Sequence, residues 1–557
     1  MREKNDPHSF VVITHARPMD YLRDYVSLPA EYGTPAYDAR EDVKAIKAAV
    51  TENLKQLDEN THFTEKIKGK RVIIKPNLVC VFHNLGSVQK DSPESTDPRV
   101  VDAVIDFIQP FTNRITIVES SGRGMPTRAS FKISGLDRLA KYRGVELVPL
   151  EEQATDRYLL PRAKVMKEIV VPRIFSEVVR GEAFYISIPK MKTNLYTGVT
   201  LGFKNAMGTI TYNLRQRNHN HAIDQKLVDM LFLFKADLVV IDGIVGGAGD
   251  CPAPVAPVDS RVIISGNQSV ETDRVATRMM GFDPEKIALM RAADAIGFND
   301  PGVTVLGEEK VFNFTPAEAS LTGSWMAEHF PNVKVLVGHT KNNAPRPGTD
   351  LRIPATQMRD MEYTCMGGCL ASTRYAFAMF LHEGQKRNFK MTLILGAGVQ
   401  LNGQVYYYDA SGKPYTLEEI KKLPGKKLAI GSCARHLKEI VSRHIDGCMP
   451  FPNSQHATLH LMTGTLCAIM SPLRNHYLIP ALLATLKVCE TRKKFYRKGI
   501  RLDIPLGNED ILYATRPLSE AEKQLDYIHE PFAPLSKAEI RELCASENRS
   551  ILATFIP

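Results

Sequence analysis

Tryptophan is scarce in this sequence. One tryptophan occurs in 557 residues, and Phe, Trp and Tyr together make up 8%. The formal charge of +9 is mild for this length. The basic residues form no stripe interleaved with aromatic side chains, so nucleic acid is the least favoured partner. The basic surplus suits a small anionic molecule better.

Long hydrophobic runs are also missing. The most apolar late stretch, Tyr477 to Cys489, is about 13 residues long and contains Pro480 and Lys487, whereas a bilayer crossing needs roughly 20 apolar residues. The charged start, Met1 to Pro7, is followed by no apolar segment typical of a signal peptide. We therefore expect a cytoplasmic protein with no membrane partner.

Cysteine is too sparse for a disulfide scaffold, with nine residues in the whole chain. In a reducing compartment, clustered cysteines more often hold a metal or perform chemistry than form disulfides. Hydrophobic residues at 44% and charged residues at 24% are typical of globular domains and exclude a disordered chain. At about 100–200 residues per domain, this length predicts two or three folded units.

The first 300 residues alternate short β-branched, apolar runs with stretches whose apolar residues follow helical spacing. This alternation predicts an α/β domain with a parallel or mixed sheet, whose ligands bind beyond the carboxyl ends of the strands. The expected strands are Val72–Leu78, Ile115–Glu119, Val145–Leu150, Phe184–Ile188, Leu238–Ile244 and Val262–Gly266, with helices at Pro98–Phe107 and Ser269–Met280.

A second, smaller α/β domain is expected after the turn-rich stretch that begins near Pro301. Asn402-Gly403 in this domain is typical of a hairpin turn. Its expected strands are Val333–Gly338, Met391–Leu395 and Lys427–Ile430, with helices at Leu370–His382 and Ala434–Ile445.

A helical C-terminal segment completes the expected organisation. Two capping-box pairs, Ser519 with Glu522 and Ser536 with Glu539, predict the starts of its helices. We divide the chain into a lead-in (1–69), an α/β domain (70–300), a linker (301–330), a cysteine-containing α/β domain (331–490) and the helical segment (491–557).

Lysine and asparagine side chains follow two of the expected strands in the first domain. Lys75 and Asn77 end one strand, and the Lys190–Gly208 stretch follows another. Ammonium and amide groups at strand ends can form an anion site, although lysines on a solvated rim would give the same pattern. We predict substrate binding by Lys75, Asn77, Lys190, Asn194 and Asn205, and catalytic roles for Lys192, Lys204 and Asp242.

Several sequence blocks occur in a fixed order in this domain. They are Lys75–Leu78, Ser95–Pro98, Val118–Ser121, Lys190–Gly208, Ile241–Gly243 with the glycines at 246, 247 and 249, and Glu271–Asp273 leading to Met280–Pro284. In this order the blocks resemble the domain of unknown function 362 family. The resemblance covers roughly residues 70 to 300 and implies an α/β domain often accompanied by iron–sulfur cysteines, without naming a substrate. This chain lacks the Cys-x-x-Cys-x-x-Cys run that many members carry.

Four cysteines gather in the second domain, each within two residues of a glycine. Helix N-termini favour thiolates, and glycines let the backbone approach a cluster. Four thiolates suit a [4Fe–4S] cluster, with zinc as the alternative. Unliganded thiols remain open as well, with Cys433 as a nucleophile and His436, His444 or His456 nearby in sequence. The expected ligands are Cys365, Cys369, Cys433 and Cys448.

Together these features predict an iron–sulfur enzyme of anaerobic type, an oxidoreductase or a lyase, that acts on a small anionic substrate. Such an enzyme would exchange electrons with an electron-transfer protein. The alternative is a non-redox enzyme or anion-binding protein whose cysteines hold structural zinc or no metal.

Overall fold

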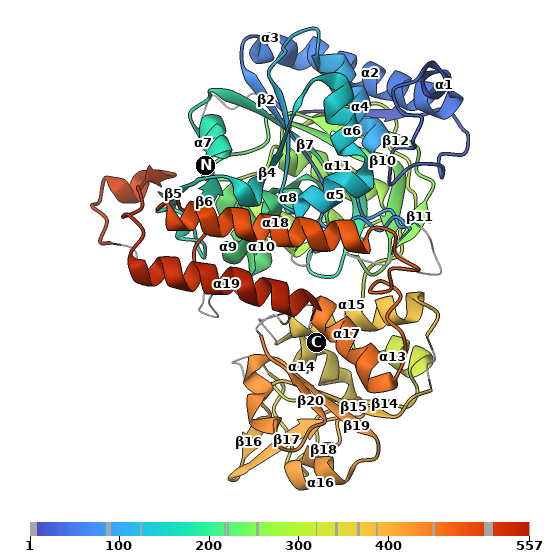
Figure 1. The fold of residues 1–557 in the computed structure, drawn as a ribbon, viewed down its shortest axis with the longest axis vertical. Helices are drawn as coiled ribbons and strands as arrows, with labels where there is room; N and C mark the ends of the chain where they lie inside the picture. The colour runs from blue at the N-terminus through green and yellow to red at the C-terminus, as the bar shows by residue number, and fades with distance from the viewer. Residues whose placement is uncertain are drawn as a thin grey trace.

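The structure is a computed structural model that describes residues 8–84, 91–122, 125–216, 219, 222–251, 255–318, 320–339, 344–364, 368–385, 388–447, 450, 452–505 and 516–555. The chain forms a larger α/β unit, a smaller α/β unit below it and long C-terminal helices (Figure 1). The predicted fold class is therefore confirmed.

A mixed sheet forms the centre of the larger unit. Neighbouring strands run parallel from β10 to β4, whereas β12 pairs antiparallel with both β10 and β1. The strands are almost wholly apolar because helices cover both faces. In spatial order they are β13 (Thr304–Leu306), β1 (Phe10–His15), β12 (Val262–Gly266), β10 (Leu238–Ala248), β7 (Ala183–Ile188), β2 (Arg71–Pro76), β3 (Ile115–Glu119) and β4 (Glu146–Pro149).

Residues assigned to the lead-in and the linker join this sheet. Strand β1 precedes residue 69 and β13 follows residue 300, and the two strands pair in parallel at one edge. The lead-in also supplies α2 (Glu41–Thr61), which packs on α4 (Pro98–Ile108) and on β1. The larger unit therefore extends beyond residues 70–300 at both ends.

Short elements after the central strands carry the polar residues of the site. The strand β8 (Lys190–Asn194) follows β7 directly and pairs with β10 and with β9 (Gly198–Val199). Helices α8 (Leu201–Asn205), η2 (Ala206–Thr209), α9 (Tyr212–Gln216) and α10 (Ile223–Met230) come next, and α11 (Ser269–Met279) packs against α8. Strand β11 (Ala256–Val258) pairs with β10.

The smaller unit is a second mixed sheet with helices on it. Helices α15 (Cys369–His382) and α17 (Pro452–Thr463) pack against each other. The strands in spatial order are β16 (Val399–Leu401), β17 (Gln404–Tyr408), β14 (Val333–Val337), β15 (Met391–Leu395), β19 (Lys426–Ile430) and β20 (Arg443–Ile445), and β18 (Pro414–Thr416) pairs with β17.

The predicted helix Ala434–Ile445 is wrong over most of its length. A short 3₁₀ helix covers Ser432–Leu437, and β20 then pairs in parallel with β19. The backbone of His444 and Ile445 forms hydrogen bonds with the open edge of β19. This pairing outweighs the helical spacing of the apolar residues in the segment.

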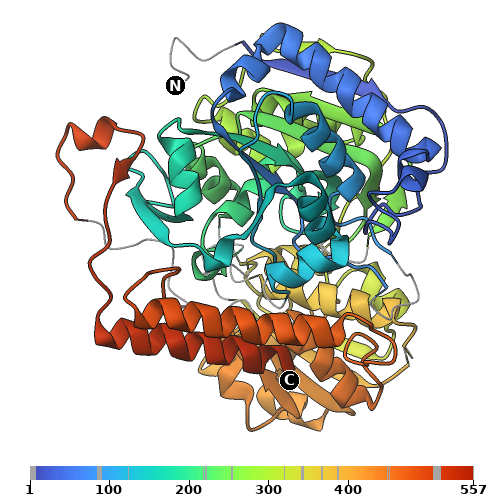
Figure 2. The same ribbon diagram turned by 45° about the horizontal axis from the view of Figure 1, so that its top comes forward.

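The C-terminal helices α18 (Leu478–Arg497) and α19 (Lys537–Phe555) lie side by side (Figure 2). The buried Arg492 of α18 binds Glu547 at 2.8 Å and Asp503 at 3.1 Å, and it donates to the carbonyl of Glu151 in the larger unit. The Ser536–Glu539 capping box forms at the start of α19, whereas Ser519–Glu522 precedes only a 3₁₀ turn, Glu522–Gln524. A small sheet of β21 (Ile528–His529), β5 (Thr155–Leu159) and β6 (Glu168–Pro172) also joins this segment to the larger unit.

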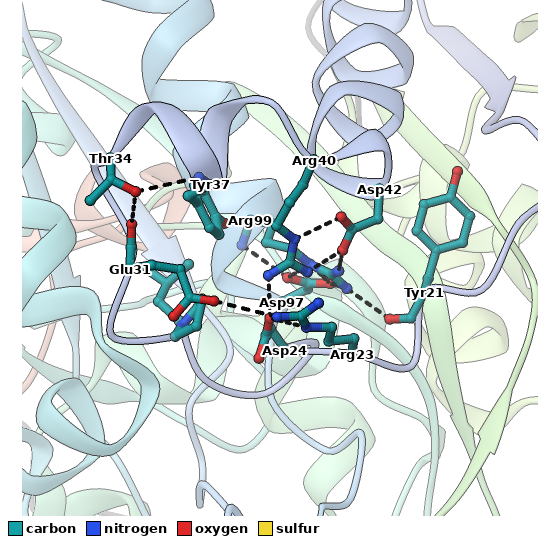
Figure 3. Close-up of polar contacts among 12 residues, drawn as sticks. Tyr21, Arg23, Asp24, Glu31, Thr34, Tyr37, Arg40, Asp42, Asp97 and Arg99 are labelled. Atoms are coloured by element: carbon teal, nitrogen blue, oxygen red, sulfur yellow. Dashed lines mark hydrogen bonds and ion pairs between the residues drawn. The ribbon is translucent and has the colours of Figure 1, made fainter.

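A chain of ion pairs fastens the lead-in to the start of α4 (Figure 3). Asp97 caps this helix and binds Arg99 at 2.7 Å, and Arg99 binds Asp42 at 2.8 Å. Arg40 joins Asp42 to Asp24, each at 2.5 Å. Asp97 and Arg99 are buried, so their charges depend on these partners.

None of the helices within the described ranges combines the length and the apolar character that a bilayer crossing requires.

Candidate functional site: a cation-lined cavity and its neighbouring ligand groups

A cavity of about 270 Å³ lies between the carboxyl ends of the large sheet and the helices α15, α17 and α18. Tyr375, His456, Cys467 and Tyr477 contribute to its wall from the second half of the chain. From the first half, the structure brings together six of the predicted site residues, namely Lys75, Asn77, Lys192, Asn194, Lys204 and Asn205.

Lys75 is held by three acceptors at the end of β2. Its Nζ lies 2.9 Å from Glu119 Oε1, 2.9 Å from Asn205 Oδ1 and 3.1 Å from the carbonyl of Pro76. Burial lowers the pKa of Lys75, although the Glu119 carboxylate opposes this shift. Because all three ammonium hydrogens are engaged, Lys75 has none left for a ligand, and its role is to hold its neighbours in position.

Gly208 is required for this arrangement. A Cβ on Gly208 would stand 2.6 Å from Lys75 Cε and 2.8 Å from Glu119 Oε1, closer than atoms can approach. The glycine therefore lets the backbone of the 3₁₀ turn pack directly on the buried ion pair.

Lys192 and Lys204 carry the charge that faces the cavity. Lys192 donates to the backbone carbonyl of Glu94. Burial raises the pKa of the Glu94 carboxyl well above its usual range, so this acid does not neutralise Lys192. For the Lys204 ammonium, the described residues provide no hydrogen bond or ion pair, and burial together with the Arg215 and Lys192 cations lowers its pKa to about 7.

Arg215 and His219 also line the cavity, and sequence reasoning assigned neither of them to the anion site. Arg215 binds the backbone carbonyls of Ser120 and Ser121 at 2.7 Å each, and its buried Nε has no hydrogen-bond partner. His219 lies 2.8 Å from the carbonyl of Arg215, and burial lowers its pKa well below the usual range. Among the described lining residues Glu119 is the one acid, so the cavity has a surplus of positive charge.

Lys190 and Asp242 lie in the sheet and do not line the cavity. Their side chains are fully buried and form an ion pair at 2.7 Å. Asp242 also accepts hydrogen bonds from the backbone N–H groups of Asp97 at 2.7 Å and Ile244 at 3.1 Å. This placement favours a structural role, and the predicted substrate-binding and catalytic roles of the two residues stay predictions.

Cys369 and Cys433 meet at Gly431, although 63 residues separate them in sequence. A Cβ on Gly431 would stand 3.2 Å from Cys369 Sγ and 3.5 Å from Cys433 Sγ. Gly431 has φ 102°, a conformation that favours glycine, and it follows β19 directly. Cys369 begins α15 after Gly368, which has φ 85°, so both sulfurs are placed by glycine turns at element ends.

Cys365 and Cys448 lie outside the described residues. The described backbone next to Cys448 is anchored to the same turn, because Ser432 N donates to Gly447 O at 3.1 Å and Gly447 N to Ser432 Oγ at 3.1 Å. Cys365 precedes Cys369 by four positions in the chain.

Tyr196 connects the sulfur pair with the cavity. Its side chain lines the cavity and packs in the apolar cluster that contains Cys369. Burial raises the pKa of Tyr196, and the nearby Cys369 and Cys251 sulfurs raise it further. Tyr196 is half-buried, and Cys251 lines the cavity as well.

A second group of ligand-type side chains lies at the other wall. Glu383, His456, His460 and Cys467 each place one potential ligand atom within 4.8 Å of the others, and such a group could hold a metal ion. Sequence reasoning left Cys467 among the unassigned cysteines and considered His456 only as a base. The signal available in the sequence was the spacing of His456 and His460, one helical turn apart.

The histidines considered as partners of Cys433 make other contacts. His436 Nε2 lies 3.3 Å from Tyr407 Oη, His444 Nε2 lies 2.9 Å from Gly431 O, and His456 belongs to the second ligand group. This arrangement gives no support to a Cys433–histidine nucleophile pair.

The fold and the site define a two-unit α/β protein with a cation-lined cavity at the junction and metal-type ligands beside it. Residues 72–278 match the family described as Domain of unknown function (DUF362), which confirms the resemblance for the central part of the larger unit. The chain is also similar to the thylakoid-associated protein sll1697 of Synechocystis sp., with 25% identity over 239 residues, or 42% of this chain and 69% of that protein. No solved structure matches the chain.

Proposed function

We propose that this protein is an iron–sulfur enzyme that acts on a small anion bound in the cavity. The observation that carries the proposal is the meeting of Cys369 and Cys433 at Gly431, in the unit that closes a cation-lined cavity. Tyr196 lines the cavity and packs against the apolar cluster that contains Cys369, which supports coupling between the two sites.

The residues at Gly431 fit a sulfur-ligated metal group. The absence of a side chain at Gly431 leaves a cradle in which two cysteine sulfurs stand. Cys369 and Cys433 would be two ligands, and Cys365 and Cys448 would supply the others by their positions in the chain. When bound, such a cluster supplies single electrons or a Lewis-acidic iron.

Exposure of Cys433 supports a partner in electron transfer. Cys433 is exposed, whereas Cys369 is buried on the side of Tyr196. A cluster held by both residues would therefore have one ligand, Cys433, that is accessible from the surface. An electron-transfer protein docking near Cys433 is the partner this arrangement suits.

The proposal of an anionic substrate rests on cationic side chains in the cavity that have no acidic partner among the described lining residues. Lys75 and Glu119 neutralise each other, which leaves the charges of Lys192, Lys204 and Arg215 for a ligand. Lys192 and Lys204 would bind carboxylate or phosphate oxygens as point charges, and the apolar remainder of the wall would strengthen these contacts by excluding water.

Lys204 is the residue best suited to move a proton. A pKa of about 7 means that both protonation states are populated near neutral pH, which is the condition under which a general acid or base works best. The Lys204 ammonium would release its proton to a substrate oxygen or carbon, or the neutral amine would accept one from it.

Anion binding is expected to weaken as the pH rises through 7. Below this pH the Lys204 ammonium attracts the anion, and above it the neutral amine does not. Isothermal titration of the full-length protein with inorganic phosphate and with malonate, between pH 6 and pH 8.5, measures this. We expect the affinity to fall about tenfold or more over this range.

The variant Lys204→Met should bind the probes weakly and with little pH dependence, while the exposed Lys68→Met should match the wild type. Equal affinity and equal pH profiles for wild type and Lys204→Met would show that Lys204 does not contact the anion. Loss of binding in Lys68→Met as well would point to a nonspecific charge effect.

A further inference from the structure

A group of four potential metal ligands lies outside the proposed iron–sulfur site. It consists of Glu383, His456, His460 and Cys467. We infer that these four residues form a second metal centre, which binds one divalent transition-metal ion at the wall of the cavity. Zn²⁺ is the ion that this set of two imidazoles, one carboxylate and one thiolate suits best. Metal binding here does not depend on the proposed iron–sulfur cluster.

The ligand atoms already lie near tetrahedral spacing. His460 Nε2 is 3.2 Å from His456 Nε2 and 3.0 Å from Glu383 Oε2, and His456 Nε2 is 3.4 Å from Glu383 Oε1. Zinc bonds of about 2.0–2.3 Å require ligand separations of about 3.3–3.8 Å. Cys467 Sγ lies 3.8 Å from Nδ1, the other ring nitrogen of His456, and one ligand atom from each of the four residues lies within 4.8 Å of the others.

Three structural elements hold the group together. Glu383 follows α15, and His456 and His460 project from one face of α17, which packs against α15. Cys467 comes from the loop after α17. A site built across two packed helices and a loop has its geometry fixed by the core of the smaller unit and needs little rearrangement to bind an ion.

Neighbouring contacts orient the ligands as in established metal sites. Thr465 Oγ1 lies 2.9 Å from His460 Nδ1, a contact that leaves Nε2 free to face the centre. The backbone N–H of Ala468 donates to Glu383 Oε2 at 3.1 Å and fixes the carboxylate. Hydrogen bonds to the atoms of a ligand side chain that do not bind the metal fix the orientation of that side chain.

Without a bound ion, the polar atoms of this group do not all have hydrogen-bond partners. Glu383 is 5% exposed, and its Oε1 has no hydrogen-bond partner. The two Nε2 atoms point at each other and at the same carboxylate, so at most a subset of these contacts can be hydrogen bonds at once. One cation at the centre would satisfy both imidazole lone pairs and both carboxylate oxygens.

Two of the four ligands, His456 and Cys467, also line the cavity. An ion bound to them would therefore stand at the cavity wall, on the side away from the lysines of the large sheet. If the proposed anion site is correct, this ion would polarise a carbonyl or phosphoryl oxygen of the same ligand. On binding, the Cys467 thiol gives its proton to solvent and becomes the thiolate ligand.

Cobalt titration of the full-length protein tests the site directly. We would use the Cys369→Ser/Cys433→Ser background, freed of metal by a chelator, because it removes two ligands of the proposed iron–sulfur cluster. The expected result is one Co²⁺ per chain, with the absorption of tetrahedral Co²⁺ and a thiolate charge-transfer band. Adding Cys467→Ser should abolish the charge-transfer band while Co²⁺ still binds.

His460→Asn should weaken Co²⁺ binding by more than about 100-fold, since loss of an outer contact alone costs up to that much. Glu383→Gln keeps the side-chain shape and should weaken binding without unfolding the unit, as circular dichroism would verify. His529→Asn, at an exposed histidine, is the matched control and should bind as the parent does.

Two outcomes would overturn the inference: less than about a tenth of an equivalent of Co²⁺ bound to the folded parent protein, or equal affinity in the parent and His460→Asn. The iron–sulfur proposal is judged separately. A wild-type protein that takes up no iron but binds Co²⁺ at this group would refute the cluster and leave this second centre standing.

Discussion

Replacing Cys369 and Cys433 by serine is expected to reduce the iron content of anaerobically reconstituted protein to less than about a tenth of the wild-type value. The two sulfurs meet at Gly431, and serine oxygens there cannot replace thiolates as ligands of an iron–sulfur cluster. The measurement is iron and acid-labile sulfide per chain after anaerobic purification and reconstitution. The fold should survive, because each change replaces one sulfur atom by a smaller oxygen atom.

Cys544→Ser is the matched control, since Cys544 lies in α19, far along the chain from the Gly431 turn. We expect it to bind iron as the wild type does. Wild-type protein without stoichiometric iron, or a double variant that retains it, would contradict the cluster assignment. Stoichiometric zinc in place of iron would support the alternative that the four cysteines hold a structural zinc.

Replacing Lys190 by methionine is expected to lower the free energy of unfolding by about 3–5 kcal/mol. The substitution leaves the Asp242 carboxylate buried without its partner, whereas the wild-type pair lies at 2.7 Å with both side chains fully buried. The loss should extend to the ion-pair chain, because Asp242 also holds the backbone of Asp97, the cap of α4. Chemical denaturation followed by circular dichroism measures the change.

The double variant Lys190→Met/Asp242→Asn should recover a large part of this loss. The asparagine carries no charge and can still accept one of the backbone hydrogen bonds that Asp242 receives. A loss below about 1 kcal/mol in Lys190→Met would show that the pair is not desolvated. A stable Lys190→Met protein that no longer binds phosphate would instead restore Lys190 to the anion site.

The strands of both sheets could be predicted well because they are buried on both faces. Ile115–Glu119, Val262–Gly266 and Met391–Leu395 have the predicted boundaries, since continuous β-branched runs leave little choice of structure. The hairpin at Asn402-Gly403 also forms, between β16 and β17, with φ values of 49° and 77°. Edge strands such as β13 and β20 were missed because only pairing with a neighbour decides them.

The candidate site was predictable where polar residues end a strand. Lys75 lies at the end of β2 and Asn77 follows it, and the strand ends of one parallel sheet meet at one edge, which brings both residues to Asn205. The sequence could not separate Lys190 from Lys192, because strand periodicity places residues two positions apart on the same face. The structure pairs Lys190 with Asp242 and places Lys192 at the cavity. The group of Glu383, His456, His460 and Cys467 was not predicted, because Glu383 and Cys467 lie outside the helix that carries the two histidines. No local sequence pattern shows that these segments pack together.

Locating iron in a crystal of the anaerobically purified full-length protein tests the central claim most directly. Anomalous scattering at the iron absorption edge reports the position of each iron atom independently of its chemical form. The proposal predicts a strong iron peak beside Gly431, within bonding distance of Cys369 Sγ and Cys433 Sγ. A crystal of the same material without iron at these sulfurs would contradict it.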